Sequence, residues 1–131
     1  MLAAASLDDT LQRIDIARVI GALENKRFRF CSEDDLQKGI ELALKQAELP
    51  YEREKPLSER DRPDFMVGAG LAIEVKIKGT LAQALRQVSR YTEHQRIDAV
   101  LLVGTPYWMR DVPSSINGKP IYAMRLTSSL L

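Results

Sequence analysis

The stretch Arg62–Lys76, with the sequence RPDFMVGAGLAIEVK, contains two short apolar runs separated by Gly68-Ala69-Gly70. Apolar runs of this length on either side of a glycine-rich turn are typical of a β-hairpin, and both Gly68 and Gly70 are expected to supply the positive φ of the turn. The sequence therefore predicts strands near residues 63–67 and 71–78. The rest of the chain is interpreted around this hairpin.

The register of the hairpin follows from the length of its turn. If residues 68–70 form the turn, Val67 lies opposite Leu71, and Asp64 lies opposite Glu74. Directly opposed residues point to one face with Cβ atoms roughly 4.5–5.5 Å apart, and a residue two positions along the strand shares that face. Lys76 is then expected beside the two acids. The residues expected on the other face, toward a core, are Ile73, Val75 and Ile77.

Two acids that face each other on neighbouring strands repel, so this pairing needs a compensating charge. A divalent cation with hard oxygen ligands is one candidate. The alternative is a surface hairpin on which Asp64, Glu74 and Lys76 are solvated. A two-residue turn would pair Asp64 with Val75 and separate the carboxylates onto opposite faces, so a shared cation requires the three-residue turn.

Composition limits the kinds of site that the chain can build. Cys31 is the only cysteine and His94 the only histidine, which excludes a disulfide framework, a thiolate zinc site and a zinc site with several histidines. Any metal must be held by carboxylates, which favours Mg²⁺, Mn²⁺ or Ca²⁺. The net charge of +1 means that affinity for nucleic acid has to come from local basic clusters.

Length and hydropathy predict one domain over residues 1–131, because 131 residues with 45% apolar content suffice for a single core. We expect residues 1–26 to be an N-terminal helix and residues 32–126 to be the core. No apolar run is long enough to cross a membrane, and the N-terminus lacks the pattern of a signal peptide. Both observations predict a cytoplasmic protein without a membrane partner.

Periodicity predicts the remaining elements. Ser32 and Asp35 have the spacing of a capping box, and Thr80 can cap a further helix. The apolar run 99–104 is typical of a strand buried on both faces. The expected elements are helices at 6–26, 32–49 and 80–95, strands at 51–57, 63–67, 71–78, 99–104 and 120–126, and a loop at 105–119. Such an order predicts a mixed sheet with helices on both faces, in an α/β or α+β sandwich.

Pro63-Asp64, followed ten residues later by Glu74-Val75-Lys76, resembles the motif of the PD-(D/E)XK nuclease superfamily. The helix after the hairpin carries Gln87 and Tyr91, which are similar to the Q-x-x-x-Y element of one branch. That branch includes nuclease domains of bacterial recombination helicase–nucleases, phage exonucleases and small DNA-repair nucleases. The resemblance extends from about residue 32 to residue 103. It implies a restriction-endonuclease-like core, αβββαβ, with a mixed four- to five-stranded sheet flanked by helices, to which this chain adds an N-terminal helix.

The resemblance also implies a chemistry: Mg²⁺-dependent (or Mn²⁺-dependent) hydrolysis of phosphodiester bonds in DNA. The enzyme would select structures or strand ends, in repair, recombination or phage DNA processing. The metal ligands would be Asp64, Glu74 and the carbonyl of Val75, and Lys76 would orient or activate the attacking water. The implied catalytic residues are thus Asp64, Glu74 and Lys76.

The family often adds a glutamate from the helix before the hairpin, and Glu33 is our candidate for this fourth catalytic residue. Its alternative role is to complement the helix dipole. Glu41 and Glu54 are alternative candidates, with a solvated position as the alternative role of Glu41.

Substrate contacts are expected from the helix after the hairpin and from nearby basic residues. Gln87 and Tyr91 are one helical turn apart and would line the site; the alternative is that Tyr91 is a core aromatic and Gln87 a surface residue. Basic residues could form a local phosphate-binding face. Those expected to bind substrate are Arg62, Lys78 and Arg90, with Arg53, Lys55, Arg60 and Arg86 nearby. Tyr107 and Trp108 lie on the loop 105–119 and could stack on a base or pack in a core or against a partner.

The expected partner is DNA, and a homodimer or larger complex is possible, with the N-terminal helix as the candidate dimer element. Two other classes of function remain open. One is a nucleic-acid-binding module of the same fold that does not cleave, and the other is an assembly subunit that uses the N-terminal helix.

Overall fold

The structure, a computed structural model, describes residues 16–24 and 26–126. Residues 16–24 are helical, which confirms this part of the predicted N-terminal helix; residues 1–15 and the tail 127–131 lie outside the described residues. The elements that follow are α2 (Glu33–Gln46), β1 (Tyr51–Arg53), β2 (Phe65–Val67), β3 (Leu71–Lys76), α3 (Leu81–Thr92), β4 (Ala99–Gly104), the 3₁₀ helix η1 (Tyr107–Asp111), β5 (Ser115–Ile116) and β6 (Lys119–Arg125).

The strands form one mixed sheet in the order β1-β2-β3-β4-β6-β5. β1, β2 and β3 are an antiparallel meander, whereas β3, β4 and β6 run parallel. Helix α3 is the crossover between β3 and β4, as a parallel pair requires. β4 is central and wholly buried, which confirms the interpretation of residues 99–104.

The sheet has six strands rather than the expected four to five. The additional strand is β5, inside the stretch 105–119 that we expected to be a loop. β5 and β6 form a hairpin in which Ile116 pairs with Lys119 across Asn117 and Gly118, both with positive φ. Asn-Gly is the preferred sequence for such a two-residue turn, so the residues that form this hairpin do carry a local signal.

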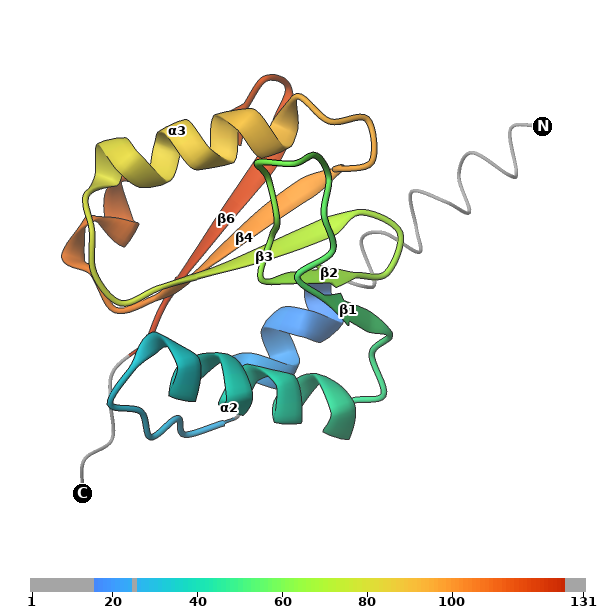
Figure 1. Cartoon of the computed structure of the whole chain (residues 1–131). Coiled ribbons are helices and arrows are strands. Elements are labelled where there is room, and N and C mark those ends of the chain that lie inside the picture. The colour runs from blue at the N-terminus through green and yellow to red at the C-terminus, as the bar shows by residue number, and fades with distance from the viewer. Residues whose placement is uncertain (1–15, 25, 127–131) are drawn as a thin grey trace.

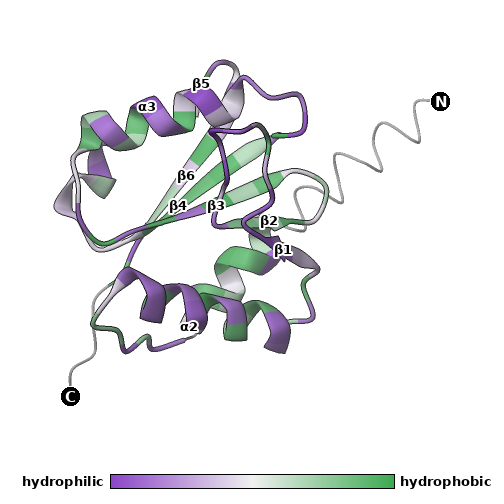
Figure 2. Cartoon of the chain, in the orientation of Figure 1, coloured by the Kyte–Doolittle hydropathy of each residue, from purple (hydrophilic) through white to green (hydrophobic). Residues whose placement is uncertain are grey.

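Helices cover both faces of the sheet (Figure 1). Helix 16–24 and α2 lie on one face and α3 on the other, where η1 also packs. We call these the α2 face and the α3 face. Figure 2 shows that the central strands are predominantly apolar, whereas α2 and α3 alternate between apolar and polar residues, as expected for helices with one side on a core.

The α2 face holds the larger apolar cluster. Ile73 and Val75 are fully buried in it, and Ile77 packs against its edge, as the alternation along the hairpin predicts. Leu36, Ile40, Ala43 and Leu44 are the buried residues of α2. Val19 and Leu23 bring helix 16–24 into the same cluster, so the described part of the N-terminal helix is docked on its own chain.

The helix caps form largely as predicted. Ser32 Oγ accepts a hydrogen bond from the backbone N–H of Asp35 (3.1 Å) at the start of α2. The Asp35 carboxylate accepts from Cys31 N rather than from Ser32 N, so the reciprocal half of this capping box is displaced by one residue. Thr80 and Gln83 form a complete capping box at the start of α3.

Two local predictions are wrong. The strand expected over 51–57 ends at Arg53, because Glu54 adopts a φ of 49° and leaves the extended conformation. Gly68 has the expected positive φ of 58°, but Gly70 does not. Glycine is required at position 70 for space, since a Cβ there would lie 2.8 Å from the carbonyl oxygen of Arg96 and would also overlap the Asp98 carboxylate.

Among the described residues, no helix is both long enough and apolar enough to span a bilayer.

Candidate functional site

The hairpin brings Asp64 and Glu74 together. β2 and β3 pair Phe65 with Ile73 and Val67 with Leu71, which is the register of the three-residue turn. Asp64 directly precedes β2, and its backbone N–H donates to Glu74 Oε1 (3.3 Å). The Val75 N–H donates to Asp64 Oδ2 (2.7 Å), so the carboxylate of Asp64 is held against β3. The predicted pairing of the two acids is therefore present.

The Glu74 carboxylate is buried on the α3 face, with its side chain only 6% exposed. Its Oε1 accepts hydrogen bonds from the Tyr91 hydroxyl (2.9 Å) and from Asp64 N. Its Oε2 lies 3.4 Å from Lys76 Nζ. Lys76 is the next residue of β3 on this face, as the strand alternation predicts. Its ammonium is paired with Glu74, and its charge lowers the pKa of both acids.

The two carboxyl groups are held in an environment that disfavours their charge. Burial raises the pKa of Asp64 to about 6, and the nearby charge of Glu33 adds to this, although the Val75 N–H and Lys76 act in the opposite direction. Burial, followed by the charge of Asp64, raises the pKa of Glu74 to about 7, against the opposing effects of Lys76 and Tyr91. One ammonium therefore does not compensate for one buried and one half-buried carboxylate.

Tyr91 connects α3 to the hairpin. Its hydroxyl, buried beneath α3, lies 2.9 Å from Glu74 Oε1 and 3.2 Å from the carbonyl oxygen of Arg62. Burial and the charge of Glu74 raise the pKa of Tyr91, so the hydroxyl keeps its proton. The hydroxyl has one proton for two acceptors, and while Glu74 is ionised the shorter contact to the carboxylate receives it.

Gln87 lies one helical turn before Tyr91 on α3. Because α3 runs back across the sheet from the carboxyl end of β3, a residue one turn before the neighbour of Glu74 lies near the level of Lys76. The Oε1 atom of Gln87 is buried and has no hydrogen-bond partner among the described residues. A buried acceptor without a partner is unusual in proteins.

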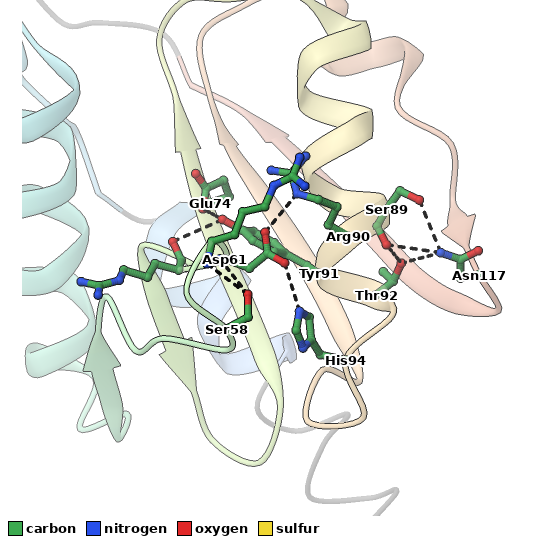
Figure 3. A network of polar contacts seen from close by, with 11 residues as sticks. Ser58, Asp61, Glu74, Ser89, Arg90, Tyr91, Thr92, His94 and Asn117 are labelled. Atoms are coloured by element: carbon green, nitrogen blue, oxygen red, sulfur yellow. Dashed lines mark hydrogen bonds and ion pairs between the residues drawn. The ribbon is translucent and has the colours of Figure 1, made fainter.

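Asp61 is a site residue that the sequence interpretation missed. Its buried carboxylate accepts from Arg90 Nε (3.0 Å) and contacts His94 Nε2 (3.1 Å), as Figure 3 shows. Burial alone would raise the pKa of Asp61, but the hydrogen bonds and charges of His94 and Arg90 lower it below its usual value. Asp61 thus fastens the loop before β2 to α3, and nothing local in its sequence distinguishes it from other acids of a charged loop.

The structure distinguishes the three candidate glutamates. Glu33, in the first turn of α2, is near enough for its charge to raise the pKa of Asp64. Glu41 instead accepts from the Tyr51 hydroxyl (2.7 Å) and pairs with Arg53, so it joins α2 to β1. Glu54 is exposed at the end of β1. Glu33 is therefore the glutamate of α2 that shares the electrostatic environment of the pair.

The basic residues fall into two groups. Arg53, Lys55 and Arg90 are bound to acids within the chain: Glu41, Glu52 and Asp61 respectively. No ion pair involving the other predicted cations is recorded within residues 16–24 and 26–126, and their side chains are exposed. These residues are Arg60, Arg62, Lys78 and Arg86.

The possible metal donors are few. Among the described residues, no cluster of three or more histidine, cysteine, aspartate or glutamate side chains could hold a metal ion. Of the predicted ligands, the structure brings the carboxylates of Asp64 and Glu74 together. In a strand the N–H and C=O of one residue point to the same side. The hydrogen bond from the Val75 N–H to Asp64 therefore indicates that the carbonyl of Val75 is also directed toward Asp64.

Comparison of the chain with models of protein families, with curated proteins and with solved structures finds no match.

Proposed function

We propose that this protein is a Mg²⁺-dependent nuclease of the PD-(D/E)XK type that hydrolyses phosphodiester bonds in DNA. The observation that carries the proposal is the convergence of Asp64, Glu74 and Lys76 on one face of a hairpin whose register brings the carboxylates together. The restriction-endonuclease-like core belongs to the same proposal. It is supported by the meander β1-β2-β3, the crossover α3 and the parallel strand β4.

The donor set fits a small, hard cation. Two carboxylates and a carbonyl are oxygen ligands of the kind that Mg²⁺ prefers, and such ions usually keep several waters beside one or two carboxylates. The raised pKa values of Asp64 and Glu74 indicate negative charge that the protein compensates only in part. A bound Mg²⁺ would neutralise this charge, stabilise charge on the phosphate and lower the pKa of a coordinated water.

The residues of the chain have separate roles in the proposed reaction. The Val75 N–H holds Asp64 Oδ2, and Tyr91 and the Asp64 N–H hold Glu74 Oε1, so both carboxylates are oriented before substrate binds. Lys76 orients the attacking water and stabilises negative charge on the phosphate. Gln87 Oε1 accepts a hydrogen bond from a water or from the substrate.

The experiment is a cleavage assay on linear, nicked, branched and single-stranded DNA with Mg²⁺ or Mn²⁺. We compare the wild type with Asp64→Asn and Lys76→Ala, and use Lys38→Ala as a matched control because Lys38 lies on the exposed side of α2 in a solvent-exposed pair with Asp34. We expect the first two variants to lose at least about 100-fold in rate, the scale of a lost electrostatic or acid–base group, and the control to keep it. A wild type that cleaves no substrate, or site variants as active as the control, contradicts the proposal.

Calorimetric titration with Mg²⁺ tests the metal independently of cleavage. Wild-type protein should bind Mg²⁺, and Asp64→Asn should bind it more weakly, since one of two carboxylate ligands is neutral. Equal binding by both proteins would place the metal elsewhere.

A further inference from the structure

Tyr107 is the most exposed large apolar side chain among the described residues, at 75%, and Leu42 (56%) is the other in that class. It opens η1 directly after Pro106. The neighbouring Trp108 is tied down instead, because its Nε1–H donates to the carbonyl oxygen of Gly79 (3.0 Å). The Tyr107 ring is thus exposed although the neighbouring aromatic side chain is anchored.

The ring is held by a cation. The guanidinium carbon of Arg125 lies 4.2 Å from the centre of the Tyr107 ring. Arg125 Nε also donates to the carbonyl oxygen of Thr105 (3.0 Å), which fixes the guanidinium relative to the loop. With one face covered, the exposure of Tyr107 comes from its other face and its edge. A rigid aromatic face beside a positive charge matches the two recognition elements of a nucleotide, the base and the phosphate.

Tyr107 and Arg125 lie at the same end of the sheet as the candidate site, near the end of β3. Thr105 donates from its backbone N–H to the carbonyl oxygen of Lys76 (3.1 Å) and from its hydroxyl to that of Ile77 (3.2 Å). Tyr107 is two residues further on, so its Cα lies at most ~7 Å from that of Thr105. At a rise of about 3.4 Å per nucleotide along a strand, Tyr107 therefore lies at most about four nucleotides from Lys76.

We propose that Tyr107 and Arg125 form a stacking platform for an unpaired base of the nucleic-acid strand that occupies the candidate site. This inference rests on the proposed nuclease function and names its substrate more closely. The face of a base is accessible only where the base is unpaired, so the preferred substrate has a single-stranded segment or end beside the cleaved bond. Tyr107 supplies the stacking face and Arg125 contacts the phosphate backbone.

A binding experiment tests the platform without cleavage. The full-length chain carrying Asp64→Asn is the parent, and fluorescence anisotropy measures its affinity for three labelled probes of equal length: a single strand, the same strand with every base removed, and a blunt duplex. Tyr107→Ala, Tyr107→Phe and Leu42→Ala are each added to the parent, and circular dichroism verifies that they are folded. Leu42→Ala is the control for loss of an exposed apolar side chain.

We expect Tyr107→Ala to weaken binding of the single strand about 5- to 150-fold, the range for loss of one stacked base. Tyr107→Phe should keep the affinity of the parent because the ring face, not the hydroxyl, makes the contact. Neither variant should change binding of the abasic strand or the duplex, and Leu42→Ala should change none of the three.

The outcomes separate this inference from the proposed function. If the parent binds the single strand and Tyr107→Ala binds it equally well, the platform is wrong while the nuclease proposal is untouched. An equal loss on the abasic strand also contradicts the platform, because it assigns the effect to charge or shape rather than to a base. If the parent binds none of the three probes, the platform is also contradicted, whereas the cleavage assay with wild-type protein decides the nuclease proposal separately.

Discussion

The two faces of the sheet differ in what they bury, although they share the same strands. On the α2 face, Phe65, Ile73 and Val75 pack into a cluster of apolar side chains with α2 and helix 16–24. On the α3 face, the alternate residues of the hairpin begin with Met66 and Ala72, which are apolar, and continue to Glu74. The same β3 thus contributes to an apolar core on one side and a buried charged group on the other.

This difference indicates a division of roles. Apolar burial on the α2 face stabilises the fold by roughly 25 cal/mol per Å² of area removed from water. Burial of Glu74 on the α3 face opposes folding unless the charge is compensated. Among the described residues, its carboxylate contacts Lys76, Tyr91 and the backbone N–H of Asp64. Proteins often keep incompletely compensated buried charges at functional sites, which agrees with the proposed nuclease site on this face.

The largest stability effect is expected from the α2 face. Ile73→Ala removes a fully buried side chain from the apolar cluster, and we expect the free energy of unfolding to fall by about 2–5 kcal/mol in urea denaturation. Ile77→Ala, at the edge of the cluster, should cost less and serves as the matched control. Equal losses for the two variants would contradict the assignment of the core to this face.

Glu74→Gln should raise the free energy of unfolding, in contrast to Ile73→Ala, when the protein is kept in EDTA. The pKa of Glu74 is raised to about 7 from 4.5, so the folded chain binds more protons than the unfolded chain between these values, and wild-type stability falls as pH rises through this window. The variant lacks this loss and should be more stable than wild type by about 3 kcal/mol at pH 8 and similar to it near pH 4.

Urea denaturation at several pH values measures this difference, and Glu93→Gln, at the exposed C-cap of α3, is the control. A Glu74→Gln variant that is less stable than wild type at pH 8 would show that the carboxylate stabilises the α3 face instead of straining it.

A smaller effect is expected at Asp61, the acid on the α3 face that is fully compensated. Asp61→Asn weakens the contacts to Arg90 and His94 and should lower the free energy of unfolding by about 1–2 kcal/mol at pH 7. The pKa of Asp61 is lowered in the folded state, so its contribution is present above about pH 4 and is lost as pH falls through the lowered value. The difference between the two proteins should therefore shrink on acidification, and a constant difference would exclude the charge as its source.

The smallest effects on stability are expected from removal of the two helix caps, one on a helix of each face. Ser32→Ala at α2 and Thr80→Ala at α3 each remove a side-chain acceptor and should cost about 1 kcal/mol in thermal or urea denaturation. If the nuclease proposal holds, Thr80→Ala should lower the cleavage rate more than Ser32→Ala, because α3 carries Tyr91 and Gln87 whereas α2 brings only Glu33 near the pair. Equal effects of both variants on cleavage would mean that α3 has no special part in the site.

Much of the hairpin could be predicted from its own residues. Strand alternation and the turn 68–70 place Asp64, Glu74 and Lys76 on one face, and the structure has that register. The buried strand β4 and the caps Ser32 and Thr80 could likewise be predicted, because each depends on residues within a few positions. The shortened β1 was not, because the left-handed conformation of Glu54 has no marker in its side chain.

The sequence by itself determined the local geometry of this protein: which residues alternate, where helices begin, and which acids face each other across a short turn. Only the tertiary structure decided that Tyr91 reaches Glu74 and that Asp61 joins Arg90 to His94, since these partners lie 17, 29 and 33 positions apart. The reason is physical. Strand period and turn length act between neighbours, whereas these contacts exist only after the α3 crossover has packed a helix back over the strands.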